Sequence, residues 1–366
     1  MKKPCICIII ICLFFIPLFS DAQKVYKDST VINFFRRTNG WIASDGGLTA
    51  RLSDGSVLWL MGDSHINDYD SVTGTIPCLF QVRNAAVLQP ANNWDWHATK
   101  TLTGNSTGIK SYLKNNTDDK YFMWPGAGIQ LKDTVYVYCG SLKNEGSGAF
   151  GFAAAGNDIM AKIIYPSLEV AGYDILQDFN GINFGIGFIE SNDGYVYAYG
   201  QKLDYLTNSL YVARFKNNKL GSAWQFWNGK TWQPDVKQAK AISKQDGVSG
   251  TFHISKVNDK ILLVSSALSI NCDAGKDIYT SFSKNITGPF TERKTVYTID
   301  DTLQGHYPFF YTTVAHPYFV NDKNEMLITY SINGYGTCVE TCINGRLNPD
   351  YYRLKGIRVP MSMIFQ

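Results

Sequence analysis

The sequence contains few charged residues. It also lacks the patterns typical of long helices and of low-complexity linkers. Only 18% of its 366 residues are charged, and it contains no long amphipathic stretch, no heptad repeat and no low-complexity linker. Two glycine-rich stretches, at 146–156 and 181–187, have neither the spacing of a phosphate loop nor a following helix. These absences argue against a helical protein and against nucleotide binding.

Cysteine is also scarce outside the first residues. Of eight cysteines, three lie within the first 22 residues, and the remaining five are Cys78, Cys139, Cys272, Cys338 and Cys342. An odd number spread over a long chain is not a disulfide scaffold. Cys338 and Cys342, in TCVETC, are close enough to bridge across a loop; two free thiols are the alternative.

Only one long apolar run is present, at residues 5–19, and it follows two lysines. With small residues ending at Ala22, this predicts a signal peptide over residues 1–22 and one secreted domain over 23–366, extracellular or periplasmic. No second such run follows, so no membrane span is expected. Removing two lysines and one aspartate lowers the formal charge from +3 to +2, which argues against a nucleic-acid or anionic-membrane partner.

Aromatic residues and glycine, in contrast, are abundant, with 22 Tyr, 21 Phe, 8 Trp and 32 Gly. Hairpin-like patterns recur, each a short strand, a polar turn with an aspartate, and a β-branched or aromatic strand. They are LTARLSDGSVLWLMGDS from Leu48, AGIQLKDTVYVYCGS from Ala127, IGFIESNDGYVYAYGQ from Ile186, TFHISKVNDKILLVSSA from Thr251 and HPYFVNDKNEMLITYS from His316.

This repetition predicts an all-β five-bladed β-propeller, with one hairpin of each blade toward the axis. A pair of β-sandwiches is the alternative architecture. The last strand, at 352–359, is expected to pair with residues around 25–35 and so close the ring.

The first hairpin carries two carboxylates. Asp45 precedes its first strand and Asp63 follows its second, so both belong at the same end of the sheet. Cleavage of a glycosidic bond needs such a pair, one group to protonate the leaving oxygen and one to attack or activate water. We therefore take Asp45 and Asp63 as candidate catalytic residues.

The ends of the five hairpins would contribute amides, imidazoles and aromatic rings, a mixture that suits a carbohydrate. The candidate substrate-binding residues are His316, Asn183, Trp124, His65, Asp246, His253, Tyr311 and Asn333. Several candidates have a structural alternative: Asp45 as a turn residue, Asp63 as a strand cap, the histidines as buried structural groups, and Trp124 as a core residue between blades. No spacing supports a metal site, so neither a cofactor nor an axial structural cation is predicted.

Several stretches resemble a known group of proteins. DGGLTARLSDGSVLWLMGDS, WPGAGIQLKDTVYVY, GIGFIESNDGYVYAYG, AHPYFVNDKNEMLITYS and YRLKGIRVP resemble secreted five-bladed propellers of the domain-of-unknown-function families 4185 and 5005. The wider relatives of these families include glycoside hydrolases, among them endo-acting arabinanases.

The resemblance implies that Asp45, Asp63 and His316 belong to the active-site mouth. Ala127 departs from it, because many relatives carry a carboxylate in this motif. The resemblance therefore leaves two readings: another acid (Glu145, Asp178 or Asp246) takes that role, or the protein binds carbohydrate without cleaving it.

Overall fold

The computed structural model describes residues 24–104, 108–146, 151–218, 223–269, 271–334 and 339–365. The predicted signal peptide lies outside these residues. Strands dominate the described chain, and the prediction of an all-β protein is confirmed. The helices are short: α1 (Ser29–Phe35), α2 (Met361–Ile364) and single 3₁₀ turns at Trp96–Ala98, Val236–Gln238, Pro317–Phe319 and Pro349–Tyr351. None of the described helices has the length and apolar character needed to span a membrane.

The described strands form five sheets of four or more strands and one small sheet. The first sheet contains β2 (Trp41–Arg51), β3 (Val57–Ile66), β5 (Ala85–Gln89) and β6 (Lys100–Leu102). The second contains β7 (Tyr121–Leu131), β8 (Thr134–Asn144), β9 (Phe152–Ala154), β10 (Ile159–Ile164) and β11 (Glu169–Ile175). The third contains β12 (Asn183–Glu190), β13 (Tyr195–Asp204), β14 (Thr207–Lys216), β15 (Gln225–Trp227), β16 (Trp232–Gln233) and β17 (Ser243–Asp246).

The fourth sheet contains β18 (His253–Val257), β19 (Lys260–Ser266), β20 (Asp277–Ser283) and β21 (Lys294–Thr298). The fifth contains β22 (Phe309–His316), β23 (Glu325–Asn333), β26 (Lys355–Pro360) and β1 (Tyr26–Lys27). Four predicted hairpins are present as the antiparallel pairs β2–β3, β7–β8, β12–β13 and β18–β19. The fifth pair is β22–β23, but its first strand ends at His316 instead of starting there, because Pro317–Phe319 forms a 3₁₀ turn where the sequence predicted the strand.

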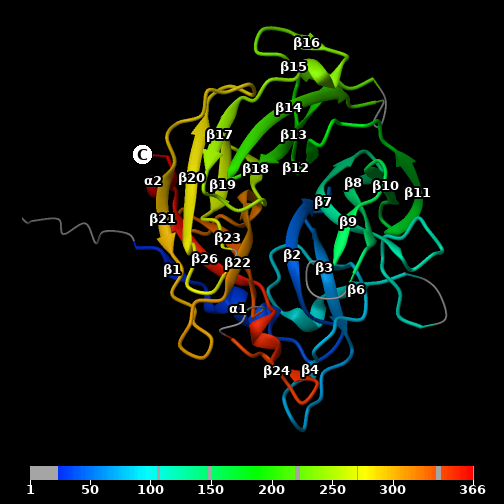
Figure 1. Ribbon diagram of the computed structural model, residues 1–366, viewed down its shortest axis with the longest axis vertical. Coiled ribbons are helices and arrows are strands. Elements are labelled where there is room, and N and C mark those ends of the chain that lie inside the picture. The colour runs from blue at the N-terminus through cyan, green and yellow to red at the C-terminus, as the bar shows by residue number, and fades with distance from the viewer. Residues whose placement is uncertain are drawn as a thin grey trace, which may run out of the picture.

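The five sheets follow one another in chain order around a central axis (Figure 1). The first strands of the hairpins are the innermost, and each contacts the next, with β22 contacting β2 again. Five of the six hydrophobic clusters in the described chain lie between two successive sheets, the last of them between the fifth sheet and the first. The sixth is small and contains Ile42, Ile76, Leu347 and Tyr352. Apolar residues are therefore buried mainly between sheets, which leaves the strand ends free to carry polar groups.

The innermost strands run in the same direction along the axis. Near the start of β22, Tyr311 contacts Asp45, which is near the start of β2; at the end of β22, His316 contacts Thr49, which is near the end of β2. We call the end of the axis at which these strands begin the entry end.

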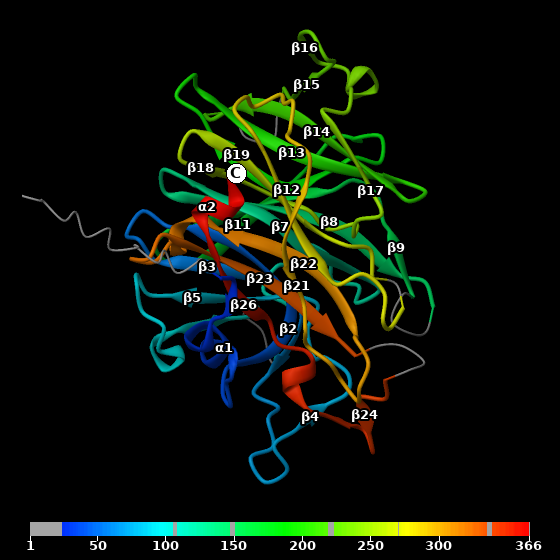
Figure 2. The same ribbon diagram turned by 90° about the vertical axis from the view of Figure 1, so that its left-hand side faces the viewer.

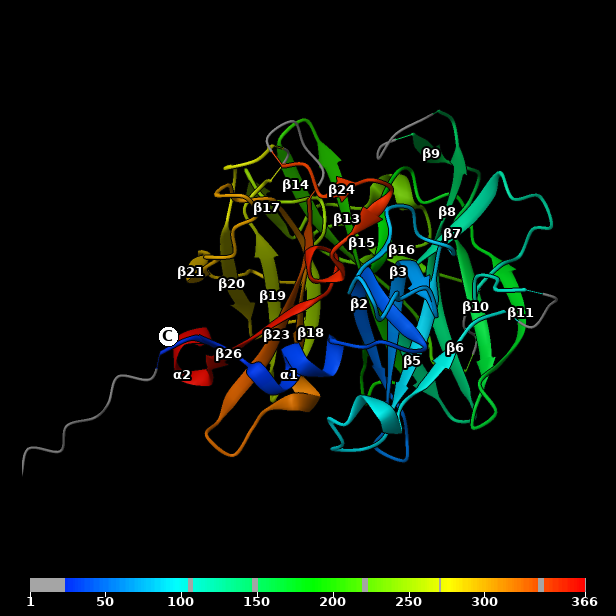
Figure 3. The ribbon, with the colours of Figure 1, turned by 90° about the horizontal axis from the view of Figure 1, so that it is seen from below.

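The chain termini meet in the fifth sheet, as expected. β26 pairs with β23 on one side and with the two residues of β1 on the other, Tyr26 opposite Arg358 and Lys27 opposite Ile357. The predicted pairing was too long, because residues 29–35 form α1 instead. Asp28 caps this helix by accepting bonds from the amides of Thr30 and Val31. The helix lies beside β26 (Figure 3).

The small sheet joins the first and fifth sheets, and we call it the seam sheet. It consists of β4 (Ile76–Pro77), β25 (Arg346–Leu347) and β24 (Cys342–Ile343), and lies at one edge of the molecule (Figures 1 and 2). A disulfide connects Cys78 to Cys342 across it. Neither alternative left open for Cys338 and Cys342, a bridge between them or two free thiols, therefore holds for Cys342; Cys338 itself lies outside the described residues.

Candidate active site at the entry end

The turn at Ser44–Gly47 sets the position of Asp45. The β2–β3 ladder shifts register around this residue, with Ser44 opposite Ser64 but Gly46 opposite Met61. Gly46 and Gly47 have φ angles of +90° and +84°, which residues with a Cβ rarely adopt. The bulge turns the Asp45 carboxyl back over the next strand, where a Cβ on Gly62 would lie 2.0 Å from Oδ1. Asp45 and Asp63 thus sit on adjoining strands at the entry end, and we call them the acid pair.

Asp45 is half-buried and is held by groups from the fifth sheet and from the segment after the seam sheet. The Tyr311 hydroxyl donates to Asp45 Oδ2 at 3.0 Å and accepts a bond from the Asn333 amide at 3.2 Å. The hydroxyl of Tyr352 is a further hydrogen-bond partner of Asp45. Two phenols thus fix this carboxyl, although only Tyr311 was expected at the site.

Asp63 is 8% exposed and is held from the second sheet and from a loop of the first. Trp124 Nε1 donates to Asp63 Oδ1 at 3.0 Å, and Arg83 Nη1 donates to Oδ2 at 3.1 Å. The guanidinium of Arg83 lies over the rings of Phe122 and Phe80, with centroids 4.1 and 4.6 Å away. Trp124 is therefore a residue of the site rather than a core residue between sheets.

Both members of the acid pair have raised pKa values. Burial raises the pKa of Asp45 to about 6, against the lowering effect of the two phenols. Burial, followed by the charge of Asp45, raises the pKa of Asp63 to about 7, although Trp124 and Arg83 oppose this. Because the two carboxyls interact, these values describe the pair, which holds about one proton in the interval between them. Acid and base forms therefore coexist near neutral pH.

Two further polar groups face this region from the second and third sheets. Asn183 is exposed at the start of β12, where its Oδ1 accepts the Gly185 amide. A Cβ built on Gly140, opposite Trp124, would lie 3.9 Å from Asn183 Nδ2 and 4.0 Å from Asp158 Oδ1. Burial raises the pKa of Asp158, whose carboxylate accepts bonds from Tyr138 and from the Ser141 amide. Asp158 is thus a third carboxylate near the entry end, and sequence reasoning missed it.

The structure does not bring the predicted histidines to the acid pair. His316 is fully buried, with Nδ1 3.0 Å from Thr49 Oγ1 and Nε2 2.8 Å from Thr329 Oγ1, and its ring lies 4.8 Å from that of Trp59. Burial lowers its pKa well below the usual value, so it is a neutral structural residue. Its placement at the mouth is incorrect because β22 begins, and does not end, at the entry end.

His253 and His65 also do not reach the acid pair from a side that a ligand could contact. His253 lines a cavity of about 220 Å³ among the far ends of the innermost strands, and burial lowers its pKa to about 4. His65 is 1% exposed; its Nδ1 is 2.7 Å from Asp68 Oδ2, and its ring packs edge-on against Tyr352. His65 therefore packs against Tyr352, the partner of Asp45, and does not itself contact the acid pair.

The alternative acids are solvent-exposed and lack a contact with the acid pair. Asp246 accepts a bond from the Thr207 hydroxyl at the outer part of the third sheet, and Glu145 pairs with Lys143, which lowers the Glu145 pKa. Asp178 accepts the Asn180 amide in a turn. Ala127 is buried in β7 and lines the far cavity. In the described part of the chain, no group of three or more His, Cys, Asp or Glu side chains is arranged to hold a metal ion.

Residues 28–361 match the model of a family described as a domain of unknown function (DUF5005), and the chain belongs to this family. A search of curated proteins found no significant match.

Solved structures show the same fold at low sequence identity. A Bacteroides ovatus protein provisionally described as a hydrolase is 20% identical, with a TM-score of 0.74 over 92% of this chain and 90% of that one. The endo-arabinase of Bacteroides thetaiotaomicron is 11% identical, with a TM-score of 0.50 over 89% of this chain and 97% of that one. The protein thus has the all-β propeller fold that also carries glycoside hydrolases.

Proposed function

We propose that this protein is a secreted five-bladed β-propeller that hydrolyses glycosidic bonds in a polysaccharide or oligosaccharide. The single observation that carries the proposal is the acid pair, two interacting carboxyls with raised pKa values beside a half-buried indole and a phenol. The blades would be the five large sheets, and the cyclic order of their innermost strands supports that count. The likeness in fold to an endo-arabinase makes an arabinan-like glycan the first candidate substrate.

Each carboxyl of the pair has an assigned role in this proposal. Asp63 has the higher pKa, about 7, and supplies the proton to the leaving oxygen. Asp45 is the more exposed and accepts bonds from two phenols, which favour its charged form, so it attacks the sugar or activates water. Trp124 and Tyr311 offer ring faces, and Asn183 and Asn333 offer amides for hydroxyl groups.

The test is a screen of the purified protein on arabinans, xylans and galactans, repeated with Asp45→Asn. This substitution keeps the size of the side chain but removes its charge, and we expect turnover to fall at least 100-fold, on the order expected for loss of a main catalytic group. Asp178→Asn is the matched control, because Asp178 is an exposed acid in a turn. Equal turnover by Asp45→Asn and the unmodified protein would remove Asp45 from the mechanism.

A non-catalytic carbohydrate-binding or surface-interaction propeller is the second candidate. The observation that favours it is Ala127, a buried methyl group in β7 where the resemblance led us to expect a carboxylate. Retarded migration of the protein in gels containing one of these glycans, without release of reducing ends, would support binding over hydrolysis.

A further inference from the structure

The seam sheet connects the first sheet, which carries Asp45, to the fifth sheet, which carries its partner Tyr311. Its strand pairs place Arg346 opposite Pro77 and Leu347 opposite Ile76, and the Cys78 amide donates to the Gly345 carbonyl. These segments come from the loop after β3 and from the connection between β23 and β26, and Cys78 and Cys342 are 264 positions apart in the sequence. The seam sheet therefore joins a loop of the first sheet to a connection within the fifth sheet.

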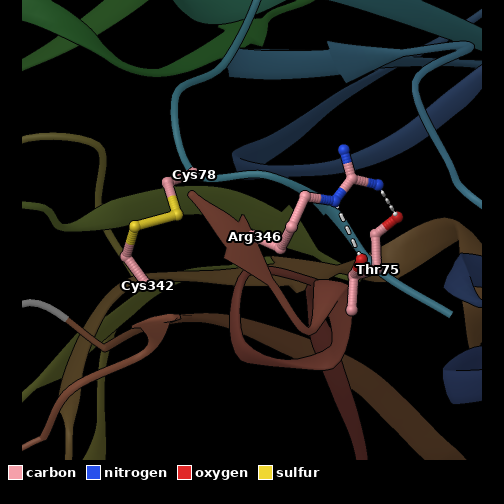
Figure 4. Close-up of a disulfide and its surroundings, with 4 residues drawn as sticks. All are labelled: Thr75, Cys78, Cys342 and Arg346. Carbon is pink, nitrogen blue, oxygen red and sulfur yellow. Dashed lines mark hydrogen bonds between the residues drawn. A yellow bond between two sulfur atoms is a disulfide. The ribbon is translucent and has the colours of Figure 1, made fainter. Parts of the chain in front are cut away.

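Side chains strengthen this junction (Figure 4). Arg346 donates from Nε to Thr75 Oγ1 at 3.0 Å and from Nη2 to the Thr75 carbonyl at 2.8 Å. Beneath the sheet, Ile76 and Leu347 pack with Ile42 and Tyr352 in a small buried cluster. The disulfide, the guanidinium and the apolar cluster thus all act on the segment that leads to Tyr352.

The chain then runs from the seam sheet to the acid pair in a few residues. Asn348 caps the 3₁₀ turn at Pro349–Tyr351, and Tyr352 follows at once, 8% exposed. Next to it, the buried Arg353 donates to the carbonyls of Ile42 and Arg37, which fixes the backbone on the far side. Tyr352 is thereby held between the seam sheet and an anchored arginine.

The same segment covers the turn that carries Asp45. Leu354 lies so close to Gly47 that a Cβ there would be 2.5 Å from its Cδ1. Asp45 is thus fixed by Tyr352, by Tyr311 and by the packing of its own turn. The charged or titratable groups that face Asp45 are Asp63, Tyr311 and Tyr352; Arg83 lies beyond Asp63, and His65 lies behind Tyr352.

We propose that Tyr352 is a positioning residue for Asp45, and that the Cys78–Cys342 disulfide keeps it in place by clamping the seam sheet. This deepens the proposed function, since it rests on the same acid pair, but it concerns the contact between Tyr352 and Asp45, which does not depend on whether a glycan is cleaved. Opening the disulfide would release the segment after β25, and the Tyr352 hydroxyl would leave Asp45.

The test follows the ionisation of Asp45 by NMR of its ¹³C-labelled carboxyl during a pH titration. Tyr352→Phe keeps the ring in the apolar cluster and removes only the hydroxyl, so the Asp45 pKa should rise by about one unit, the size expected for a lost bond to a charged group. The double variant Cys78→Ser/Cys342→Ser should raise it in the same direction. Tyr351→Phe, the neighbouring tyrosine, is the control and should leave it unchanged.

Two results would overturn the proposal: an unchanged Asp45 pKa in Tyr352→Phe, or an unchanged value in a folded double-serine variant. If the double-serine variant does not fold, Arg346→Ala, which removes both bonds to Thr75 and keeps the disulfide, takes its place under the same criterion. Glycan turnover is measured in parallel. Shifted titrations with no turnover by any form would support the clamp while rejecting hydrolysis, so the two proposals fail separately.

Discussion

The acid pair is the feature of single residues on which the proposed chemistry depends. Isolated aspartates ionise near pH 4, and two such charges side by side would supply no proton at neutral pH. Burial changes this, since it disfavours both charges at once and each carboxyl disfavours the ionisation of the other. Arg83 and the two phenols then limit the rise, so that the pair loses its protons within the range in which enzymes commonly work.

The first prediction concerns the pH dependence of hydrolysis. The pair must hold one proton, so kcat/KM should be bell-shaped, with its limbs near the pKa values of the pair, about 6 and about 7. Initial rates on the best glycan from the screen, measured between pH 4.5 and 9 in buffers of constant ionic strength, provide the test. A rate that stays flat across this range would contradict the role of the pair.

How far the sequence predicted the site depends on how local each interaction is. Asp45 and Asp63 could be placed together because one hairpin carries both. His316 could not be judged, because its partners Thr49 and Thr329 come from different strands and the sequence AHP does not reveal burial. Arg83 and Tyr352 were missed for a similar reason: each reaches the acid pair from a loop, and no periodic pattern marks a loop residue.

At the scale of elements, the hairpins were predictable and their connections were not. The apolar run Val57–Met61 and the Asp54-Gly55 turn specify β2–β3 within a few residues of chain; Gly55 has a φ of +86°, and Asp54 Oδ1 accepts the Ser56 amide. The seam sheet depends instead on pairing between two-residue strands that are far apart in the sequence. Arg346 in β25, for example, contacts Thr75 beside β4, about 270 residues away. Such short strands carry no detectable period, so both the sheet and its disulfide escaped prediction.

The second prediction concerns the contact between β3 and the bulge in β2. Gly62→Ala places a methyl group 2.0 Å from Asp45 Oδ1, and the paired strands leave the carboxyl as the group that must move. We expect turnover to fall about 100-fold with only a small change in the melting temperature. Gly250→Ala is the matched control, because nothing lies within 4 Å of its added Cβ. An equal fall in turnover in both variants would show that the contact between Gly62 and the bulge does not determine catalysis.

At the scale of the whole molecule, stability depends on closing the ring. β1 contributes only two residues to the fifth sheet, so side chains must hold the N-terminal segment. Asp28 does so twice: its Oδ1 caps α1, and its Oδ2 accepts a bond from Arg358 Nε at 2.6 Å. The side chain of Arg358 is only 8% exposed, so its charge relies on this partner.

The third prediction follows from that closure. Asp28→Ala removes the helix cap and leaves a buried guanidinium unpaired, which should lower the free energy of unfolding by about 3 kcal/mol. Urea unfolding followed by tryptophan fluorescence measures the change. Asp70→Ala, which removes a more exposed carboxylate 3.9 Å from Arg346, is the control and should cost much less, because water screens an exposed ion pair. Equal losses in the two variants would show that closure does not depend on Asp28.

The fourth prediction links the acid pair to the stability of the whole fold. The folded-state pKa of Asp63 is about 7, well above its unfolded value of 3.8, so between these values the folded protein binds more protons than the unfolded chain. Protonation of Asp63 therefore stabilises the fold at low pH, and this contribution is lost as the pH rises toward and through about 7. Asp45, with a folded pKa of about 6, acts in the same direction.

Carboxylates with lowered pKa values, such as Asp54 and Asp193, act in the opposite direction, so the unmodified protein alone cannot isolate the effect. The measurement is instead a comparison with Asp63→Asn, which cannot ionise and also relieves Asp45 of a neighbouring charge. Between pH 5 and 8 the unmodified protein should lose on the order of 2–4 kcal/mol more unfolding free energy than this variant. Parallel pH profiles of stability would mean that Asp63 ionises near its ordinary pKa in the folded protein. The pair could then no longer hold a proton at neutral pH, and Asp63 could not be the acid of the proposed hydrolysis.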